Sequence, residues 1–168
     1  MSKSDRQALQ SLDDESRADF QLARLNRVLD QARQHSFYRE RLAETPNRLD
    51  CLEQLRELPL LSKHELIGDH RGEPGKIFDL PAARYSRLHQ TSGTKGWPIP
   101  VLDTEQDWQW WLECWQYVLD AADVSSDDVA MMAFSFGPFI GFWTANDALV
   151  RRGVMVVPGG GMSSEARL

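Results

Sequence analysis

Apolar residues recur three or four positions apart near the start of the chain, with charged residues between them. This spacing predicts a helix from about residue 15 to residue 43. The pattern weakens at His35 and Ser36, so we expect a break or bend there. Pro46 marks the end of the segment, because the residue before a proline is pushed out of the helical region. Residues 1–14 are mostly polar and are expected to form a flexible N-terminus.

The next segment contains two short helical signals. Residues 51–58 predict a short helix that ends at Pro59. Ser62 and Glu65 have the spacing of a capping box, in which each side chain binds the backbone of the other residue. His64 and Glu65 could be read as an acid and base pair, but neighbouring helical positions point in different directions. We therefore interpret Ser62 and Glu65 as a helix start.

The middle of the chain predicts two strands and a long helix. Residues 84–90 alternate as in a strand, and residues 99–102 follow as a short strand. Pro98 and Pro100 cannot donate to a sheet, which indicates an edge position. Thr104 predicts the cap of a helix that runs to about residue 122. One face of this helix is apolar and contains Trp108, Trp111, Leu112, Trp115, Val118, Leu119 and Ala122. This face could pack in the core or bind a ligand, and we favour the core.

The last part of the chain predicts a strand, a helix and a second parallel strand. Residues 129–134 form an uninterrupted apolar run, which is typical of a strand that is buried on both faces. A helix over about 138–152 leads into a buried strand at 154–157, which makes a right-handed crossover. Ligands bind beyond the carboxyl ends of such strands, so residues 135–139 and 158–161 are candidate site segments. The three glycines at 159–161 could also form a simple turn.

These elements predict an α/β fold with N-terminal helices, a β-hairpin and a βαβ unit of an incomplete sheet. Residues 163–168 look like the first turn of another helix. Two parallel strands cannot by themselves form a sheet with both faces covered. We therefore expect residues 15–168 to be the N-terminal portion of a larger domain that is truncated at its C-terminus.

Composition and charge indicate which kinds of binding partner the protein is not expected to have. A formal net charge of −6 argues against a nucleic-acid-binding surface. The polar N-terminus lacks the apolar core of a signal peptide, and no apolar run is long enough to span a membrane. Cys51 and Cys114 are isolated and have no metal-ligand spacing. We expect a cytoplasmic protein that binds neither nucleic acid nor membrane.

The strongest chemical signal is a loop rich in glycine and hydroxyl groups at residues 91–98, between the two predicted hairpin strands. Glycines allow a tight turn whose successive N–H groups can surround an anion, and Lys95 adds a positive charge. The loop therefore suits phosphate. It is not a Walker loop, because Lys95 precedes Gly96 instead of following the second glycine. A plain glycine-rich hairpin turn is the alternative.

The loop resembles the [ST]-[ST]-G-[ST]-[ST]-G-x-P motif of adenylate-forming enzymes. Lys95 stands where a second hydroxyl residue is usual, and Trp97 stands where a lysine is common. The matching positions are Thr91, Ser92, Gly93, Thr94, Gly96 and Pro98. Over residues 20–168 the chain resembles the phenylacetate–CoA ligase family in particular. Four further segments resemble patterns of the family, which are given in parentheses. They are 37–41 (P-F-Y-R-x-R), 58–66 (L-P-x-x-[ST]-K-x-x-L), 133–141 (A-Y-G-Y-G-x-F-x-G) and 157–161 (a glycine-rich turn).

The resemblance implies an enzyme that uses ATP to convert a carboxylic acid to an acyl-adenylate and then transfers the acyl group to coenzyme A. It implies an aryl or other apolar acid, with Mg²⁺ accompanying ATP. The implied phosphate-binding residues are Thr91, Ser92, Gly93, Thr94, Lys95 and Gly96, and the implied acid pocket contains Phe136, Pro138 and Phe139. The family's nucleotide-base, ribose and magnesium contacts and its catalytic lysine lie further along than these 168 residues. No catalytic residue is therefore assigned.

Three interpretations follow for the chain. In the first, the full-length protein is the ligase, and this chain alone lacks turnover. In the second, the chain is a non-catalytic remnant or an interaction module whose tryptophan-rich helix is covered by a partner. In the third, it is a stand-alone phosphate-binding domain, which would require the open sheet to fold by itself. A dimer is compatible with each of them.

Overall fold

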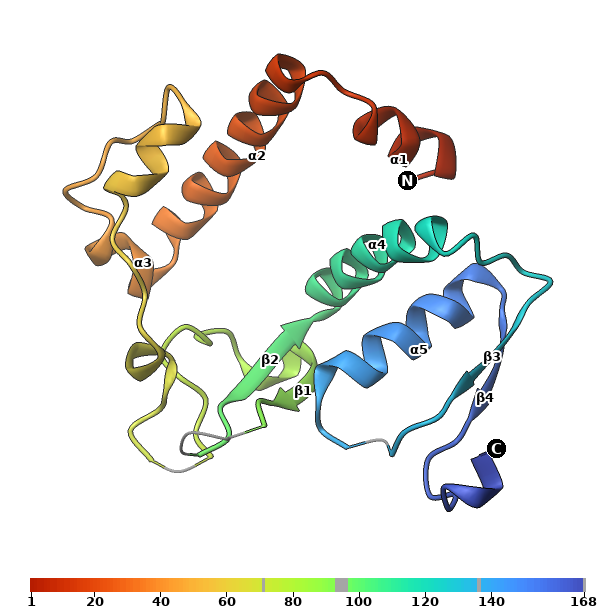
Figure 1. Cartoon of the computed structure of the whole chain (residues 1–168). Helices are drawn as coiled ribbons and strands as arrows, with labels where there is room; N and C mark the ends of the chain where they lie inside the picture. The colour runs from red at the N-terminus through yellow and green to blue at the C-terminus, as the bar shows by residue number, and fades with distance from the viewer. Residues whose placement is uncertain (71, 93–96, 136, 168) are drawn as a thin grey trace. The chain divides into compact units, whose positions relative to one another are not determined.

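The computed structural model describes residues 1–70, 72–92, 97–135 and 137–167. The chain divides into two compact units, Met1–Leu66 and Ile67–Leu168 (Figure 1). The first unit is helical, whereas the second unit combines helices with two small sheets. In the described parts of the chain, no helix is both long enough and apolar enough to cross a membrane.

The first unit contains the predicted helical segment with its break. Helix α2 (Asp14–Gln34) and helix α3 (Ser36–Arg41) are separated by His35, whose backbone is extended. The His35 ring accepts a hydrogen bond from the backbone N–H of Phe37 and so caps α3. Helix α1 (Lys3–Gln10) lies within the segment that was expected to be flexible. Ser2 starts α1 through a capping box, a signal that was missed because the segment has few apolar residues.

The core of this unit is small and is supported by polar contacts. Leu29, Leu42 and Leu49 are buried together. Asn26 is also buried, and its side chain binds both the N–H and the carbonyl group of Leu49, at 2.8 and 2.9 Å. These bonds satisfy backbone groups that would otherwise be buried without partners.

The C-terminal end of the first unit contains two 3-10 helices, Leu52–Glu57 and Lys63–Leu66. Both lie where short helical pieces were predicted. The Glu65 carboxylate accepts hydrogen bonds from the backbone N–H and hydroxyl of Ser62 and pairs with Arg41. Glu65 therefore acts as a structural cap here.

The second unit begins with the predicted antiparallel pair of strands. Strand β1 (Tyr85–Gln90) follows a 3-10 turn at Ala82–Arg84 and pairs with β2 (Pro100–Thr104). At the open end of the pair, Thr91 and Ile99 exchange two hydrogen bonds: the Thr91 N–H donates to the Ile99 carbonyl group, and the Ile99 N–H donates to the Thr91 hydroxyl oxygen. Residues 93–96 of the glycine-rich segment lie outside the described residues.

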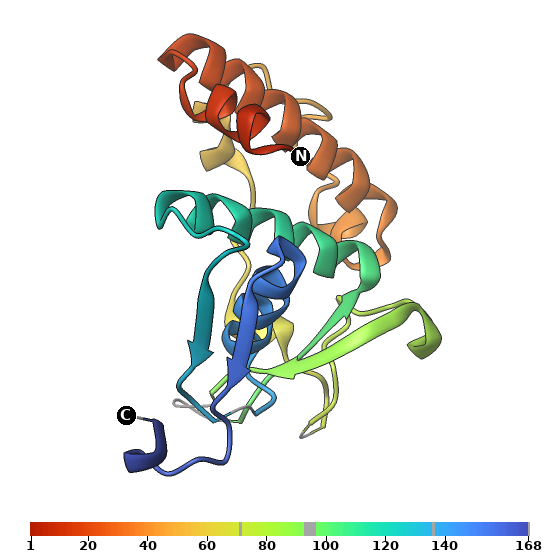
Figure 2. The ribbon, with the colours of Figure 1, turned by 90° about the vertical axis from the view of Figure 1, so that its right-hand side faces the viewer.

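The rest of the second unit is a long helix and a parallel βαβ unit (Figure 2). Helix α4 (Glu105–Ala121) starts at the predicted cap Thr104, which forms a capping box with Asp107. Strand β3 (Val129–Met132) is parallel to β4 (Met155–Pro158), and helix α5 (Ile140–Arg152) connects them. Gly153 ends α5 with a φ of 88°, a conformation that glycine adopts without steric cost. A 3-10 turn at Glu165–Arg167 follows.

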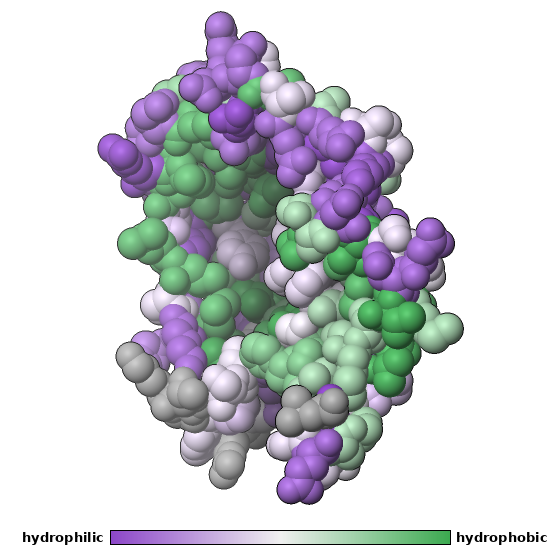
Figure 3. All heavy atoms as spheres, turned by 45° about the vertical axis from the view of Figure 1, so that its right-hand side comes forward, coloured by the Kyte–Doolittle hydropathy of each residue, from purple (hydrophilic) through white to green (hydrophobic). Residues whose placement is uncertain are grey.

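One prediction about the sheet was wrong. The apolar runs of β3 and β4 indicated burial on both faces, but only one face packs, against α4 and α5 through Ala130, Met132 and Val156. The alternating residues on the other face, Val129, Met131, Met155 and Val157, are 40–66% exposed. Figure 3 shows hydrophobic residues at the surface of the molecule. The difference arises because the pattern records apolar side chains and not the elements that cover them.

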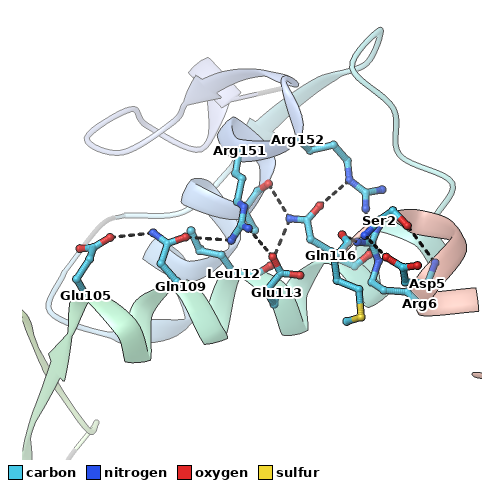
Figure 4. Close-up of polar contacts among 12 residues, drawn as sticks. Ser2, Asp5, Arg6, Glu105, Gln109, Leu112, Glu113, Gln116, Arg151 and Arg152 are labelled. Carbon is cyan, nitrogen blue, oxygen red and sulfur yellow. Dashed lines mark hydrogen bonds and ion pairs between the residues drawn. The ribbon is translucent and has the colours of Figure 1, made fainter. Parts of the chain in front are cut away.

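Helices α4 and α5 are joined by a polar network as well as by apolar contacts (Figure 4). The Arg152 guanidinium donates to the Asp120 carboxylate at 2.6 Å and to the carbonyl groups of Val124 and Gln116. Gln116 is buried and donates to the carbonyl group of Ala148 at 3.2 Å. The apolar stripe of α4 was largely correct, but two residues placed on it are exposed: Val118, at 54%, and Ala122, which follows the last residue of the helix.

Candidate functional site

Two segments from different parts of the sequence meet at the end of β1. The backbone N–H of Gln90 donates to the carbonyl oxygen of Pro138 at 2.6 Å. Gln90 directly precedes the glycine-rich segment, and Pro138 belongs to the aromatic segment before α5. A pocket of ≈ 420 Å³ lies beside this contact; its lining residues are Arg87, Leu88, His89, Gly137, Pro138 and Trp143. The pocket is therefore adjacent to the base of the predicted phosphate loop.

His89 is the buried member of the pocket wall, with 4% of its surface exposed. Its ring stacks on the ring of Trp108, with centroids 5.2 Å apart and an interplanar angle of 10°. The Nδ1 atom faces Oδ2 of Asp103 at 3.5 Å, and Asp103 is 5% exposed. Within the described residues, neither of these two atoms has a hydrogen-bond partner of normal length. The protein thus holds an imidazole beside a carboxyl group in a place with little water.

The electrostatic surroundings of this pair include both signs of charge. Burial raises the pKa of the Asp103 carboxyl group, and the neighbouring His89 acts in the opposite direction. The Arg87 guanidinium lies over the Trp108 ring, 5.0 Å from its centroid, and 3.8 Å from the Asp147 carboxylate. The Trp108 indole N–H also donates to Asp147, at 3.0 Å. Trp108 therefore connects the strand that carries His89 to helix α5.

The structure places only some of the predicted phosphate-binding residues. Thr91 and Ser92 are exposed at the end of β1. The Thr91 hydroxyl oxygen already accepts the Ile99 N–H at 3.0 Å, so it closes the base of the loop. The remaining predicted residues of this group lie outside the described residues; they are Gly93, Thr94, Lys95 and Gly96.

The structure describes two of the three residues that were predicted for the acid pocket. Pro138 lines the pocket. Phe139 is 44% exposed, precedes the first residue of α5 and packs edge-to-face on Phe142, with ring centroids 5.2 Å apart. Phe136 lies outside the described residues. The structure therefore brings Pro138 to the pocket and turns the Phe139 ring towards its own helix.

Sequence reasoning missed several pocket residues. Arg87, Leu88 and His89 were assigned only to a strand, although a histidine two positions before a phosphate-type loop was a usable signal. Trp143 was read as part of a helix. Its indole N–H donates to the Gly137 carbonyl oxygen at 2.7 Å, which fixes the turn that forms one wall.

The two strand ends that were predicted as site segments lie next to each other. The N–H of Gly159 donates to the Met132 carbonyl oxygen at 3.0 Å, and a Cβ atom at this glycine would stand 2.6 Å from that oxygen. Arg167 donates to the Gly159 carbonyl oxygen at 3.0 Å. In the described residues, no group of three or more His, Cys, Asp or Glu side chains could hold a metal ion, so no residue is assigned to Mg²⁺.

Comparison with curated proteins finds phenylacetate–coenzyme A ligases. The chain is 31% identical over 134 residues to the enzyme of Pseudomonas putida, a match that covers 78% of this chain and 30% of the relative. It is 32% identical over 119 residues to that of Escherichia coli K12, covering 70% of this chain and 26% of the relative. The chain thus spans about 30% of the length of the relatives it matches. No family model matches it.

Solved structures show the same fold. The crystal structure of 2-hydroxyisobutyryl-CoA ligase in complex with 2-HIB-AMP and CoA superimposes with a TM-score of 0.79 and 24% identity, covering 91% of this chain and 34% of that one. A second structure of the same ligase, in complex with R3-HIB-AMP, gives a TM-score of 0.80 and 22% identity, covering 94% of this chain and 34% of that one. Sequence and fold together assign the chain to the phenylacetate–CoA ligase family of adenylate-forming enzymes, over the part of those enzymes that it matches.

Proposed function

We propose that this chain supplies the phosphate loop and the acid pocket of an enzyme that activates a carboxylic acid with ATP and transfers the acyl group to coenzyme A. The observation that carries the proposal is the hydrogen bond between Gln90 and Pro138. It joins Gln90, which directly precedes the glycine-rich segment, to Pro138, which lines an apolar pocket, and so supports the proposal. An acyl-adenylate joins an acid to a phosphate, so its formation requires two such sites side by side.

The chemistry of the two segments suits this reaction. Backbone N–H groups, hydroxyl groups and Lys95 would stabilise the negative charge that develops on pyrophosphate as it leaves. Leu88, Pro138 and Trp143 offer an apolar surface for the organic part of an acid. We propose an aryl or other apolar carboxylic acid as the substrate. Mg²⁺ would enter as the partner of ATP.

Lys95→Ala is expected to weaken binding of magnesium-ATP to the chain about tenfold or more, because it removes a charged contact to phosphate. Isothermal titration calorimetry measures the affinity directly. Lys76→Ala is the matched control: Lys76 is a lysine of the same unit whose side chain is 76% exposed and lies outside the loop. Its affinity should equal that of the wild type. Equal affinities for the Lys95 variant and the wild type would contradict the role proposed for the loop.

The chain is expected to bind ATP without exchanging pyrophosphate, because its match covers only 30% of the length of the Pseudomonas putida relative. Exchange well above that of a Thr94→Ala variant would show that the chain turns over by itself. The alternative function is a non-catalytic interaction module, which the exposed apolar residues on β3 and β4 favour. In that case magnesium-ATP would bind neither the wild type nor the variants.

A further inference from the structure

We propose that His89 contacts the carboxylate of the bound acid through Nε2, and that Asp103 and Trp108 hold the ring in position. The inference rests on the proposed function and adds a substrate-binding residue to it. His89 lines the pocket although nearly all of its surface is buried. A buried polar side chain at a pocket wall, with an unsatisfied partner behind it, is a feature that packing alone does not explain.

The orientation of the ring follows from its neighbours. Nδ1 faces the Asp103 carboxyl group at 3.5 Å, which leaves Nε2 as the ring nitrogen that is available to a ligand. Stacking on Trp108 fixes the plane of the ring. Trp108 is itself 1% exposed and is tied to Asp147, so the support is rigid. An oriented Nε2–H can donate one hydrogen bond to a ligand oxygen.

The position of His89 indicates which part of the acid it meets. His89 is two residues before Thr91, where the phosphate-type segment begins, and it shares the pocket wall with Pro138. The carboxylate of an acid that is about to react with ATP must lie between the apolar pocket and the phosphates. His89 is at this junction.

The charges around the ring fit an anionic ligand at the pocket side. Arg87 lines the pocket and adds a cation. The nearby acidic groups lie elsewhere: Asp103 is behind the ring, Asp107 is in the first turn of α4, and Asp147 on α5 is paired with Arg87 and with the Trp108 indole. The pocket therefore combines an apolar surface with the Nε2 atom of His89 and with Arg87, whose charge Asp147 offsets in part, and this pattern suits an apolar carboxylate.

The test compares two substitutions of His89, using phenylacetate as the probe. The side-chain amide of Gln can take the place of Nε2, whereas that of Asn can take the place of Nδ1 and still reach towards Asp103. His89→Asn is expected to raise the dissociation constant for phenylacetate about tenfold or more, and His89→Gln to restore a substantial part of the affinity. Circular dichroism melts of both variants show whether the fold is retained.

A second measurement distinguishes direct contact of His89 with the ligand from a purely structural role of His89. In nitrogen-15 spectra of the imidazole side chains, phenylacetate should shift the Nε2 resonance of His89, whereas the neutral phenylacetamide should not. Equal binding of phenylacetate by the Asn variant and the wild type, equal shifts with both probes, or no binding to the wild type at millimolar concentration would each overturn the inference. Binding of magnesium-ATP is measured independently, so failure here is distinguishable from failure of the proposed function.

Discussion

Replacing Trp108 by alanine is expected to lower the free energy of unfolding of the second unit by about 3–5 kcal/mol, the range typical of truncating a buried large aromatic residue. Trp108 is 1% exposed and lies in the core formed by α4, α5 and the βαβ strands. The substitution also removes the stack on His89 and the hydrogen bond to Asp147. Urea denaturation followed by circular dichroism measures the loss.

Trp110→Ala is the matched control for this experiment. Trp110 lies on the same helix, two residues away, and is 55% exposed. Its removal should change the free energy of unfolding by about 0.5 kcal/mol or less. Similar losses for the two variants would mean that α4 does not pack as described.

Arg152→Met is expected to lower the free energy of unfolding of the second unit by about 3–5 kcal/mol, because it removes a charged partner of the buried Asp120 carboxylate. The two side chains are 11% and 8% exposed, and the guanidinium also binds the carbonyl groups of Gln116 and Val124. The substitution therefore disconnects the end of α4 from the end of α5. Urea denaturation again measures the change.

Two further variants distinguish the loss of the Arg152–Asp120 ion pair from a nonspecific effect of replacing an arginine on α5. Arg151 is next in sequence, but its side chain is 38% exposed where it pairs with Glu113. Arg151→Met should cost no more than about 1 kcal/mol. The double variant Arg152→Met/Asp120→Leu should recover part of the loss, because the buried carboxylate is then removed together with the guanidinium. If Arg151→Met lowers the free energy of unfolding as much as Arg152→Met does, then burial does not determine how much these ion pairs stabilise the fold.

Much of the fold could be predicted because its signals are local. The contact of Glu65 with Ser62, the capping box at Thr104, the break at His35 and the glycine after α5 depend on residues that are close in sequence. Exposure of one sheet face could not be predicted, because it depends on which elements cover β3 and β4.

The candidate site was harder to predict, because it depends on contacts between residues that are far apart in sequence. The glycine-rich loop was visible because its chemistry is contained in one segment. The pocket beside it joins residues about 50 positions apart in sequence, such as His89 and Pro138. The contact of His89 with Asp103 depends on the register of β1 against β2, which the alternation of residues does not determine.

A thermal melt of the purified chain with and without magnesium-ATP tests most directly whether the chain contains the phosphate-binding site. We expect a cooperative transition whose midpoint rises by about 3–5 °C when ATP is present at about ten times its dissociation constant, because ligand binding to the native state adds about 1.4 kcal/mol. A transition that ATP does not move would contradict the claim that this part of the ligase fold contains the phosphate-binding site.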